Sequence, residues 1–186
     1  MIAGSLKGRR LKAPTWEGLR PTSDRARETL FNILAPRIEG AGVLDVYAGT
    51  GAIGIEAISR GAGRVTFVEQ DPRAQALIAE NLKHCGVMNG YAILGTDALR
   101  ALKRVARAAA GEPVAAFDLI VADPPYATDM NDITRVVSAA GECLAPGGVL
   151  VLEHARRAPV PEKAGRLVRS RLVRSGDTAL SFYEGT

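Results

Sequence analysis

The chain has few of the features that mark secreted, membrane-bound or metal-binding proteins. No run of about 18 apolar residues could cross a bilayer, and the start, MIAGSLKGRR, lacks the charged-then-apolar order of a signal peptide. These absences predict a cytosolic protein without a membrane partner. With 186 residues and 47% hydrophobic content, the chain is long enough for one compact domain with a sizeable core and a small extension.

Cysteine and histidine are also scarce. The two cysteines, Cys85 and Cys143, fall on the apolar stripes of expected helices and have no CxxC partner. Buried core thiols are therefore predicted, in place of a disulfide, a metal site or a nucleophile. His84 and His154 lack the spacing of metal ligands, so neither is expected to bind a metal or to act in catalysis.

Charge is distributed unevenly along the chain. Residues 1–40 carry eight Lys or Arg against four Asp or Glu, residues 41–155 carry nine against thirteen, and residues 156–186 carry seven against three. An acidic middle between two basic ends favours a cleft for a cationic small molecule flanked by surfaces for a polyanion. A set of solvated surface arginines is equally compatible with the charges alone.

From residue 42 onward, strand-like and helix-like hydrophobic periods alternate. This order predicts an α/β fold with a doubly wound, mostly parallel sheet. Strands are expected at 43–46, 65–69, 91–94, 117–122 and 149–153. Helices are expected at 53–60, 72–84, 98–110 and 130–144, the third capped by Asp97 and closed by Gly111, the last stopped by the turn 146–148. An antiparallel hairpin is expected at 167–173 and 179–183, around Gly176-Asp177.

The first 40 residues differ from the rest and are expected to form an extension to a catalytic domain at 41–186. Alternation around residues 2–11 predicts a basic β-ribbon. A helix is expected at 24–34, capped by Thr22 or Ser23.

A glycine-rich turn, DVYAGTGAIG, joins the first expected strand to a helix. Gly49, Gly51 and Gly54 fit the pattern G-x-G-x-x-G, and Glu69 ends the next strand. This pattern also fits a nicotinamide-binding dehydrogenase, because a carboxylate at this position can bind any adenosine ribose. Asp45 discriminates between the two, because it would repel a pyrophosphate and attract the sulfonium and ammonium of S-adenosylmethionine.

Four acidic residues fall at or just beyond strand ends, namely Asp45, Glu69, Asp97 and Asp123. Together they predict a site for a cationic cofactor. Structural roles remain open, since Asp97 could serve only as a helix cap and the glycines only as a tight turn.

The tetrapeptide Asp123-Pro124-Pro125-Tyr126 follows the apolar run 117–122, where a central strand should end. Ligands of open α/β sheets bind beyond such carboxyl ends. Asp123 and the Pro124 carbonyl could both accept hydrogen bonds from one amino group, and Tyr126 offers a flat face for stacking. The alternative is a Pro-Pro turn with a capping Asp.

The segments VLDVYAGTGAIGIEAISRGA, VTFVEQD and DLIVADPPY resemble motifs I, II and IV of class I S-adenosylmethionine-dependent methyltransferases. More specifically, IAGSLKGRRLKAP, LRPTSDRARETLFNIL and GDTALSFY are similar to the bacterial 16S rRNA guanine-N2 methyltransferases. The resemblance covers nearly the whole chain. It implies a Rossmann-like sheet with helices on both faces, S-adenosylmethionine as cofactor, and 16S rRNA or the assembled small ribosomal subunit as partner of a monomer without metal.

The resemblance also implies roles for individual residues. The implied cofactor-binding set is Asp45, Ala48, Gly49, Thr50, Gly51, Glu69, Gln70, Asp97 and Ala98. Asp45 would accept from the α-ammonium directly or through water, Glu69 would hold the ribose hydroxyls, and Asp97 would accept from the adenine amino group. Asp123, Pro124 and Tyr126 would bind the target base, which must leave its stack to enter.

The candidate RNA-binding residues are Lys7, Arg9, Arg10, Lys12, Arg20, Arg25 and Arg27. Their interleaving with glycine and apolar residues suits a surface that follows a phosphate backbone. The C-terminal arginines are weaker candidates, because hairpin strands often carry charges on their exposed face: Arg156, Arg157, Arg166, Arg169, Arg171 and Arg174. Two other functions remain open: an N6-adenine methyltransferase, because D-P-P-Y serves both exocyclic amines, and a methyltransferase-fold ribosome assembly factor.

Overall fold

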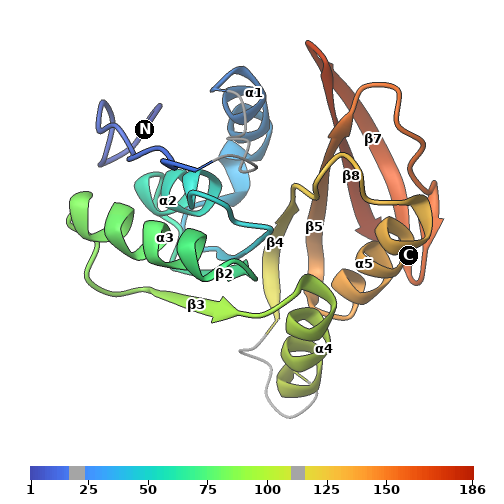
Figure 1. Cartoon of the computed structure of the whole chain (residues 1–186). Helices are drawn as coiled ribbons and strands as arrows, with labels where there is room; N and C mark the ends of the chain where they lie inside the picture. Colours follow the sequence, from blue (N-terminus) through green and yellow to red (C-terminus); the bar gives the residue numbers. More distant parts are fainter. Residues whose placement is uncertain (17–23, 110–115) are drawn as a thin grey trace.

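A computed structural model describes residues 1–16, 24–109 and 116–186 (Figure 1). The strands are β1 (Gly42–Val46), β2 (Arg64–Glu69), β3 (Tyr91–Gly95), β4 (Phe117–Ala122), β5 (Leu144–Ala155), β6 (Lys163–Ala164), β7 (Leu167–Ser175) and β8 (Thr178–Gly185). The helices are α1 (Asp24–Leu34), α2 (Ala52–Ser59), α3 (Pro72–His84), α4 (Ala98–Ala109) and α5 (Met130–Gly141), with a 3₁₀ turn η1 (Ala35–Arg37).

All eight strands form one sheet in the order β3-β2-β1-β4-β5-β8-β7-β6. The pairs among β1 to β5 are parallel, and the pairs of β8 with β5 and β7, and of β7 with β6, are antiparallel. In the register of the parallel strands, Val46 lies opposite both Val68 and Ala122. The residues that follow β1, β2 and β4 therefore meet at one edge of the sheet, and the predicted α/β fold is confirmed.

Helices cover both faces of the sheet. One hydrophobic cluster holds Phe31 of α1, Ile55 of α2 and Ile78 of α3, and a second holds residues of α4 and α5. Figure 1 shows α1, α2 and α3 on one side of the sheet and α4 and α5 on the other. Burial on both faces explains why the sequence of β4 is apolar almost throughout.

Both cysteines are buried free thiols, as predicted, one in each hydrophobic cluster. Burial raises the pKa of Cys143 to about 12 and also raises the pKa of Cys85, which keeps both thiols protonated at neutral pH. Across the described ranges, no helix is long and apolar enough to cross a membrane, and no three His, Cys, Asp or Glu side chains are grouped as metal ligands.

The predicted β-ribbon at residues 2–11 is wrong, since residues 1–16 form turns and coil. Gly4 and Gly8 have φ values of +78° and +82°, which bend the chain out of the extended conformation. The amides of Ile2 and Ala3 donate to the carboxylate of Glu56 on α2, at 2.8 and 3.0 Å, instead of pairing with a second strand. Helix α1 begins and ends where expected, whereas its proposed caps, Thr22 and Ser23, lie outside the described residues.

The expected end of the fourth helix is also wrong. Helix α5 ends at Gly141, and β5 already begins at Leu144, so the turn 146–148 lies within the strand. The register between β4 and β5 shifts there, because Phe117 lies opposite Leu144 and Leu119 lies opposite Val149. The Pro-Gly-Gly turn is therefore a bulge that accommodates extra residues in β5. The short strand β6 was not predicted, and Gly111 lies outside the described residues.

Candidate active site

The turn from β1 into α2 contains three residues in the left-handed region of φ. Gly49 and Gly51 have φ values of +56° and +78°, and Tyr47 has a φ of +65°, the one positive value at a non-glycine position in the described chain. Such a conformation is strained for a tyrosine, and such strain concentrates at functional sites. Gly54 has a different role: a Cβ there would lie 2.2 Å from the ring of Phe67, so this glycine allows α2 to pack closely on β2.

Asp45 is buried in β1, with 2% of its surface exposed. Its carboxylate accepts a hydrogen bond from the Gly54 amide at 2.9 Å. Burial raises the pKa of Asp45 to about 7, against the effect of that hydrogen bond, and the charges of Asp123 and Glu69 raise it further. Asp123 and Glu69 thus both act electrostatically on Asp45, and a bound cation would stabilise its ionised form.

Glu69, the last residue of β2, supports the glycine turn from the neighbouring strand. Its Oε2 accepts from the Gly49 amide and its Oε1 from the Asp71 amide, both at 2.9 Å. A carboxylate has about four lone-pair sites, so these two bonds leave acceptor capacity for hydroxyl groups. Gln70 beside it is exposed.

Asp97 and Ala98 follow β3, at the start of α4. Asp97 accepts from the Arg100 amide at 2.9 Å and pairs with the Arg100 guanidinium at 3.3 Å, so its capping role is confirmed. Ala98 and, in the glycine turn, Ala48 and Thr50 are buried. The contacts of these residues with a cofactor stay predictions.

The tetrapeptide 123–126 lies directly after β4. The Asp123 amide donates to the Val46 carbonyl at 3.3 Å, which extends the β1–β4 pairing and places Asp123 next to the start of the glycine turn. Pro124 is buried and Pro125 is exposed. Tyr126 has 46% of its surface exposed, and its hydroxyl lies 3.1 Å from the Thr178 hydroxyl of β8. The ring is thus held at its hydroxyl while the side chain stays accessible, as stacking on a base requires.

The candidate RNA-binding residues differ in exposure and in the contacts that their side chains make. Lys7, Arg10 and Arg25 are exposed, and Arg20 lies outside the described residues. Arg9 is exposed, and its guanidinium donates to the His84 carbonyl at 3.2 Å, while Lys12 pairs with Glu80. Arg27 is 9% exposed and pairs with Asp24 at 2.7 Å, so in this conformation it offers little surface to RNA.

Neither histidine lies among the candidate catalytic groups. His154 is 5% exposed, between the Ala155 carbonyl and the Ser181 hydroxyl, each at 2.9 Å. Burial lowers its pKa, so the ring is neutral at pH 7. His84 is exposed at the end of α3.

Sequence reasoning missed Asn81, which is fully buried on α3 and donates to the Thr50 carbonyl of the glycine turn at 3.0 Å. A signal was present, because Asn81 is a polar residue on the apolar stripe of this helix, which includes Ile78 and Leu82. It also missed Thr178, the partner of Tyr126, for which the sequence carries no comparable signal.

Known proteins share this architecture. The chain is 32% identical over 184 residues, 99% of its length, to the Ribosomal RNA small subunit methyltransferase D of Escherichia coli K12, and covers 88% of that protein. The structure of a hypothetical protein of Thermus thermophilus superposes with a TM-score of 0.79 at 30% identity, over 97% of this chain and 96% of that one. A SAM-dependent methyltransferase of Agrobacterium tumefaciens shares the fold, with a TM-score of 0.63 at 20% identity, over 86% and 60% of the two chains.

The sheet order and the glycine turn are those of the class I S-adenosylmethionine-dependent methyltransferase fold, and the relative at 32% identity over 99% of the chain is a methyltransferase by name. Within that class, the chain belongs to the family described as Conserved hypothetical protein 95, whose model matches residues 1–184. The predicted fold class and cofactor are thereby confirmed.

Proposed function

We propose that the protein transfers a methyl group from S-adenosylmethionine to the exocyclic N2 amine of one guanine in small-subunit (16S) ribosomal RNA. The observation that carries the proposal is the position of Asp123 to Tyr126 at the end of β4, next to the glycine turn. The name of the Escherichia coli relative supports ribosomal RNA as the substrate. The proposal assigns RNA docking to residues 1–40 and cofactor binding and chemistry to residues 41–186, in a cytoplasmic monomer that uses no metal ion.

The carboxylates around the glycine turn fit a cationic cofactor. Residues 45–54 contain no Lys or Arg, and the negative charges of Glu69 and Asp123 both act on Asp45. Asp45 would accept from an α-ammonium directly or through water, and Glu69 from ribose hydroxyls. Asp97 would accept from the adenine amino group, with Ala98 at the adenine edge and Gln70 beside the ring. Ala48 would line the cofactor site from the glycine turn. S-adenosylmethionine supplies an electrophilic methyl group on a positively charged sulfur.

The residues that bind the methyl acceptor have to activate a poor nucleophile. The exocyclic amine of guanine donates its lone pair into the ring, which weakens it as a nucleophile. Asp123 and the Pro124 carbonyl would accept from its two N–H groups and pull the nitrogen toward a pyramidal geometry. Tyr126 would stack on the base and hold it in line with the methyl group. Positioning and electrostatics then supply the rate, without a covalent enzyme intermediate.

The test is methyl transfer in vitro to unmethylated 16S rRNA and, separately, to small subunits assembled from it, followed by nucleoside analysis. N2-methylguanosine is expected with wild type and with Glu142→Ala, which removes an exposed carboxylate after α5. Asp123→Ala is expected to form almost none. N6-methyladenosine as product would instead identify an adenine methyltransferase. Tight subunit binding without turnover would identify an assembly factor.

A further inference from the structure

One buried side chain joins the N-terminal segment, to which the proposed function assigns RNA, to the glycine turn, to which it assigns the cofactor. Asn81 on α3 has no exposed surface. Its Oδ1 accepts from the Lys12 amide at 2.8 Å, and its Nδ2 donates to the Lys12 carbonyl at 3.3 Å and to the Thr50 carbonyl at 3.0 Å. A single carboxamide therefore fixes the basic N-terminal segment, residues 1–16, against the glycine turn.

On the cofactor side, three side chains hold the glycine turn and the start of α2. Glu69 accepts from the Gly49 amide, Asp45 accepts from the Gly54 amide, and Asn81 donates to the Thr50 carbonyl. Two of these three are expected to contact the cofactor directly. Asn81 instead bonds both to the turn and to Lys12, so a shift of the backbone on one side would be transmitted to the other side.

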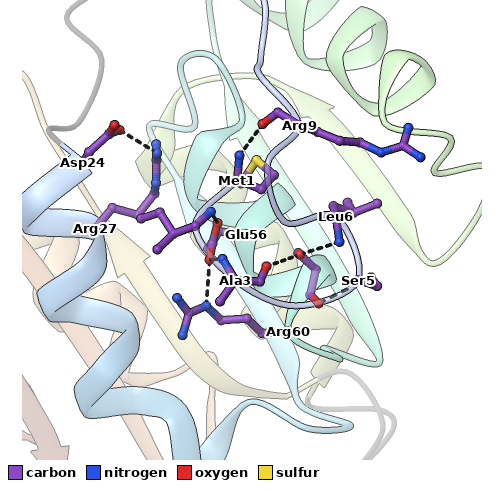
Figure 2. A network of polar contacts seen from close by, with 11 residues as sticks. Met1, Ala3, Ser5, Leu6, Arg9, Asp24, Arg27, Glu56 and Arg60 are labelled. Carbon is purple, nitrogen blue, oxygen red and sulfur yellow. Dashed lines mark hydrogen bonds and ion pairs between the residues drawn. The ribbon is translucent and has the colours of Figure 1, made fainter.

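On the RNA side, the N-terminal segment is anchored by its backbone, which leaves its charged side chains at the surface. Near its start it is anchored to α2, through Glu56 and through hydrogen bonds of Ala3 and Leu6 with the Ser59 hydroxyl (Figure 2). At Lys12 it is held by Asn81. The Lys12 ammonium pairs with Glu80, where both side chains are about half exposed (50% and 53%). Such a surface pair is weak, so an RNA phosphate could replace it while the backbone contact to Asn81 persists.

A cavity of about 620 Å³ opens between the N-terminal segment, α1 and the glycine turn. Its lining includes Arg10, Lys12, Arg27 and Thr50. Arg27, which pairs with Asp24, lies at the wall of this cavity with little exposed surface, whereas Arg10 and Lys12 are exposed there. RNA that entered here would contact both sides of the Asn81 bridge at once.

We infer that Asn81 is a positioning residue that couples the binding of RNA to the binding of the cofactor. This inference rests on the proposed function, because it takes residues 1–16 as part of the RNA-docking surface. A ligand that holds one side of the bridge in place would restrict the other side through the Asn81 hydrogen bonds, so the second ligand would bind more tightly. Linkage requires that the two ligands strengthen each other by the same factor.

The test measures the Kd of 16S rRNA with and without saturating S-adenosylhomocysteine, and the Kd of that nucleoside with and without RNA. Wild type is expected to show the same tightening in both directions, by about fivefold or more. Asn81→Asp keeps the size and the acceptor for the Lys12 amide but loses both donated hydrogen bonds, so its coupling factor should fall toward one. Glu80→Gln is the matched control, since it removes the neighbouring ion pair with Lys12 and leaves the bridge intact; its coupling should persist.

A merely structural Asn81 would lower stability or each affinity without changing the coupling factor. Undiminished coupling in a folded Asn81→Asp variant would overturn the inference. A coupling factor of one in the wild-type protein would also overturn it, and that measurement does not depend on the folding of any variant. In that second case the proposed function stands if RNA and nucleoside both bind, whereas absence of RNA binding to wild type would remove the RNA assignment and the coupling together.

Discussion

The edge of the sheet beyond β1, β2 and β4 and the N-terminal segment are built in opposite ways. At the sheet edge, the candidate cofactor-binding side chains Asp45 and Glu69 are buried and fixed by backbone amides. In the N-terminal segment the backbone is fixed, through Glu56 and Asn81, while most charged side chains are exposed. A preformed acidic site should depend strongly on single residues, whereas a basic surface should distribute its binding over many.

The largest effect is expected for Asp123→Ala. Turnover should fall roughly 100- to 1000-fold, by analogy with the loss of one preorganised electrostatic contact, while cofactor affinity changes little. Single-turnover rates and the Kd of S-adenosylhomocysteine measure the two quantities. Near-normal turnover would show that the amine is activated elsewhere.

Glu56→Ala tests how firmly the N-terminal backbone is anchored. Glu56 is fully buried and accepts from Ile2, Ala3 and the Arg60 guanidinium, so its removal leaves three partly buried donors without their acceptor. The free energy of unfolding, measured by urea denaturation, should fall by about 3 kcal/mol. Glu80→Ala is the control, because its ion pair with Lys12 is exposed and should contribute less than about 1 kcal/mol. Equal losses in the two variants would contradict the comparison.

Asp45 should make cofactor binding depend on pH. Its pKa of about 7 exceeds the ordinary value of 3.8 because of burial, so the cofactor-free fold favours the protonated form, and this group lowers stability as pH rises from about 4 through 7. An ammonium needs the ionised form. Cofactor affinity should therefore fall by up to about tenfold per pH unit below pH 7.

Calorimetry between pH 5.5 and 7.5 measures this dependence. Asp45→Asn should flatten it and weaken binding by about 1.5 to 3 kcal/mol, and Glu69→Ala should weaken binding by a similar amount. A pH dependence that survives in Asp45→Asn would assign the titration to another group. NAD is expected not to bind, and comparable NAD affinity would contradict the cofactor assignment.

The smallest effect per substituted residue is expected in the basic N-terminal segment, on the affinity for RNA. Neutralising Arg9, Arg10 and Lys12 together should reduce the slope of log affinity for RNA against log salt by about 0.7 to 0.9 per lost phosphate contact. Cofactor affinity and the methylated nucleoside should not change, because these charges would touch phosphates instead of base edges. An unchanged slope would exclude this segment from the RNA interface and direct attention to Arg166, Arg169 and Arg171.

The fold was predictable where hydrophobic periods are regular. The bounds of β4 and α3 match the expected ranges, because each element has a continuous apolar run or stripe. The ribbon prediction failed because alternation at residues 2–11 carries no information about Glu56, a distant acceptor that satisfies the same amides. The start of β5 was missed because a Pro-Gly-Gly sequence that usually ends an element is here a bulge within one.

The site was predictable in part. Acidic residues at strand ends pointed to Asp45, Glu69 and Asp123, which the register of parallel strands brings to one edge. The spacing of the glycines did not reveal that Gly54 serves packing, nor that Tyr47 adopts a left-handed conformation, because both depend on neighbouring elements. Asn81 was visible as a polar residue on an apolar stripe, but its partners were not.

Nucleoside analysis of 16S rRNA from cells with and without this protein tests the central claim most directly. The account predicts that one N2-methylguanosine is present in the first sample and missing from the second, and that wild-type protein restores it while Asp123→Ala does not. Identical nucleosides in both samples, or the loss of N6-methyladenosine instead, would contradict the assignment of the guanine amine as the methyl acceptor.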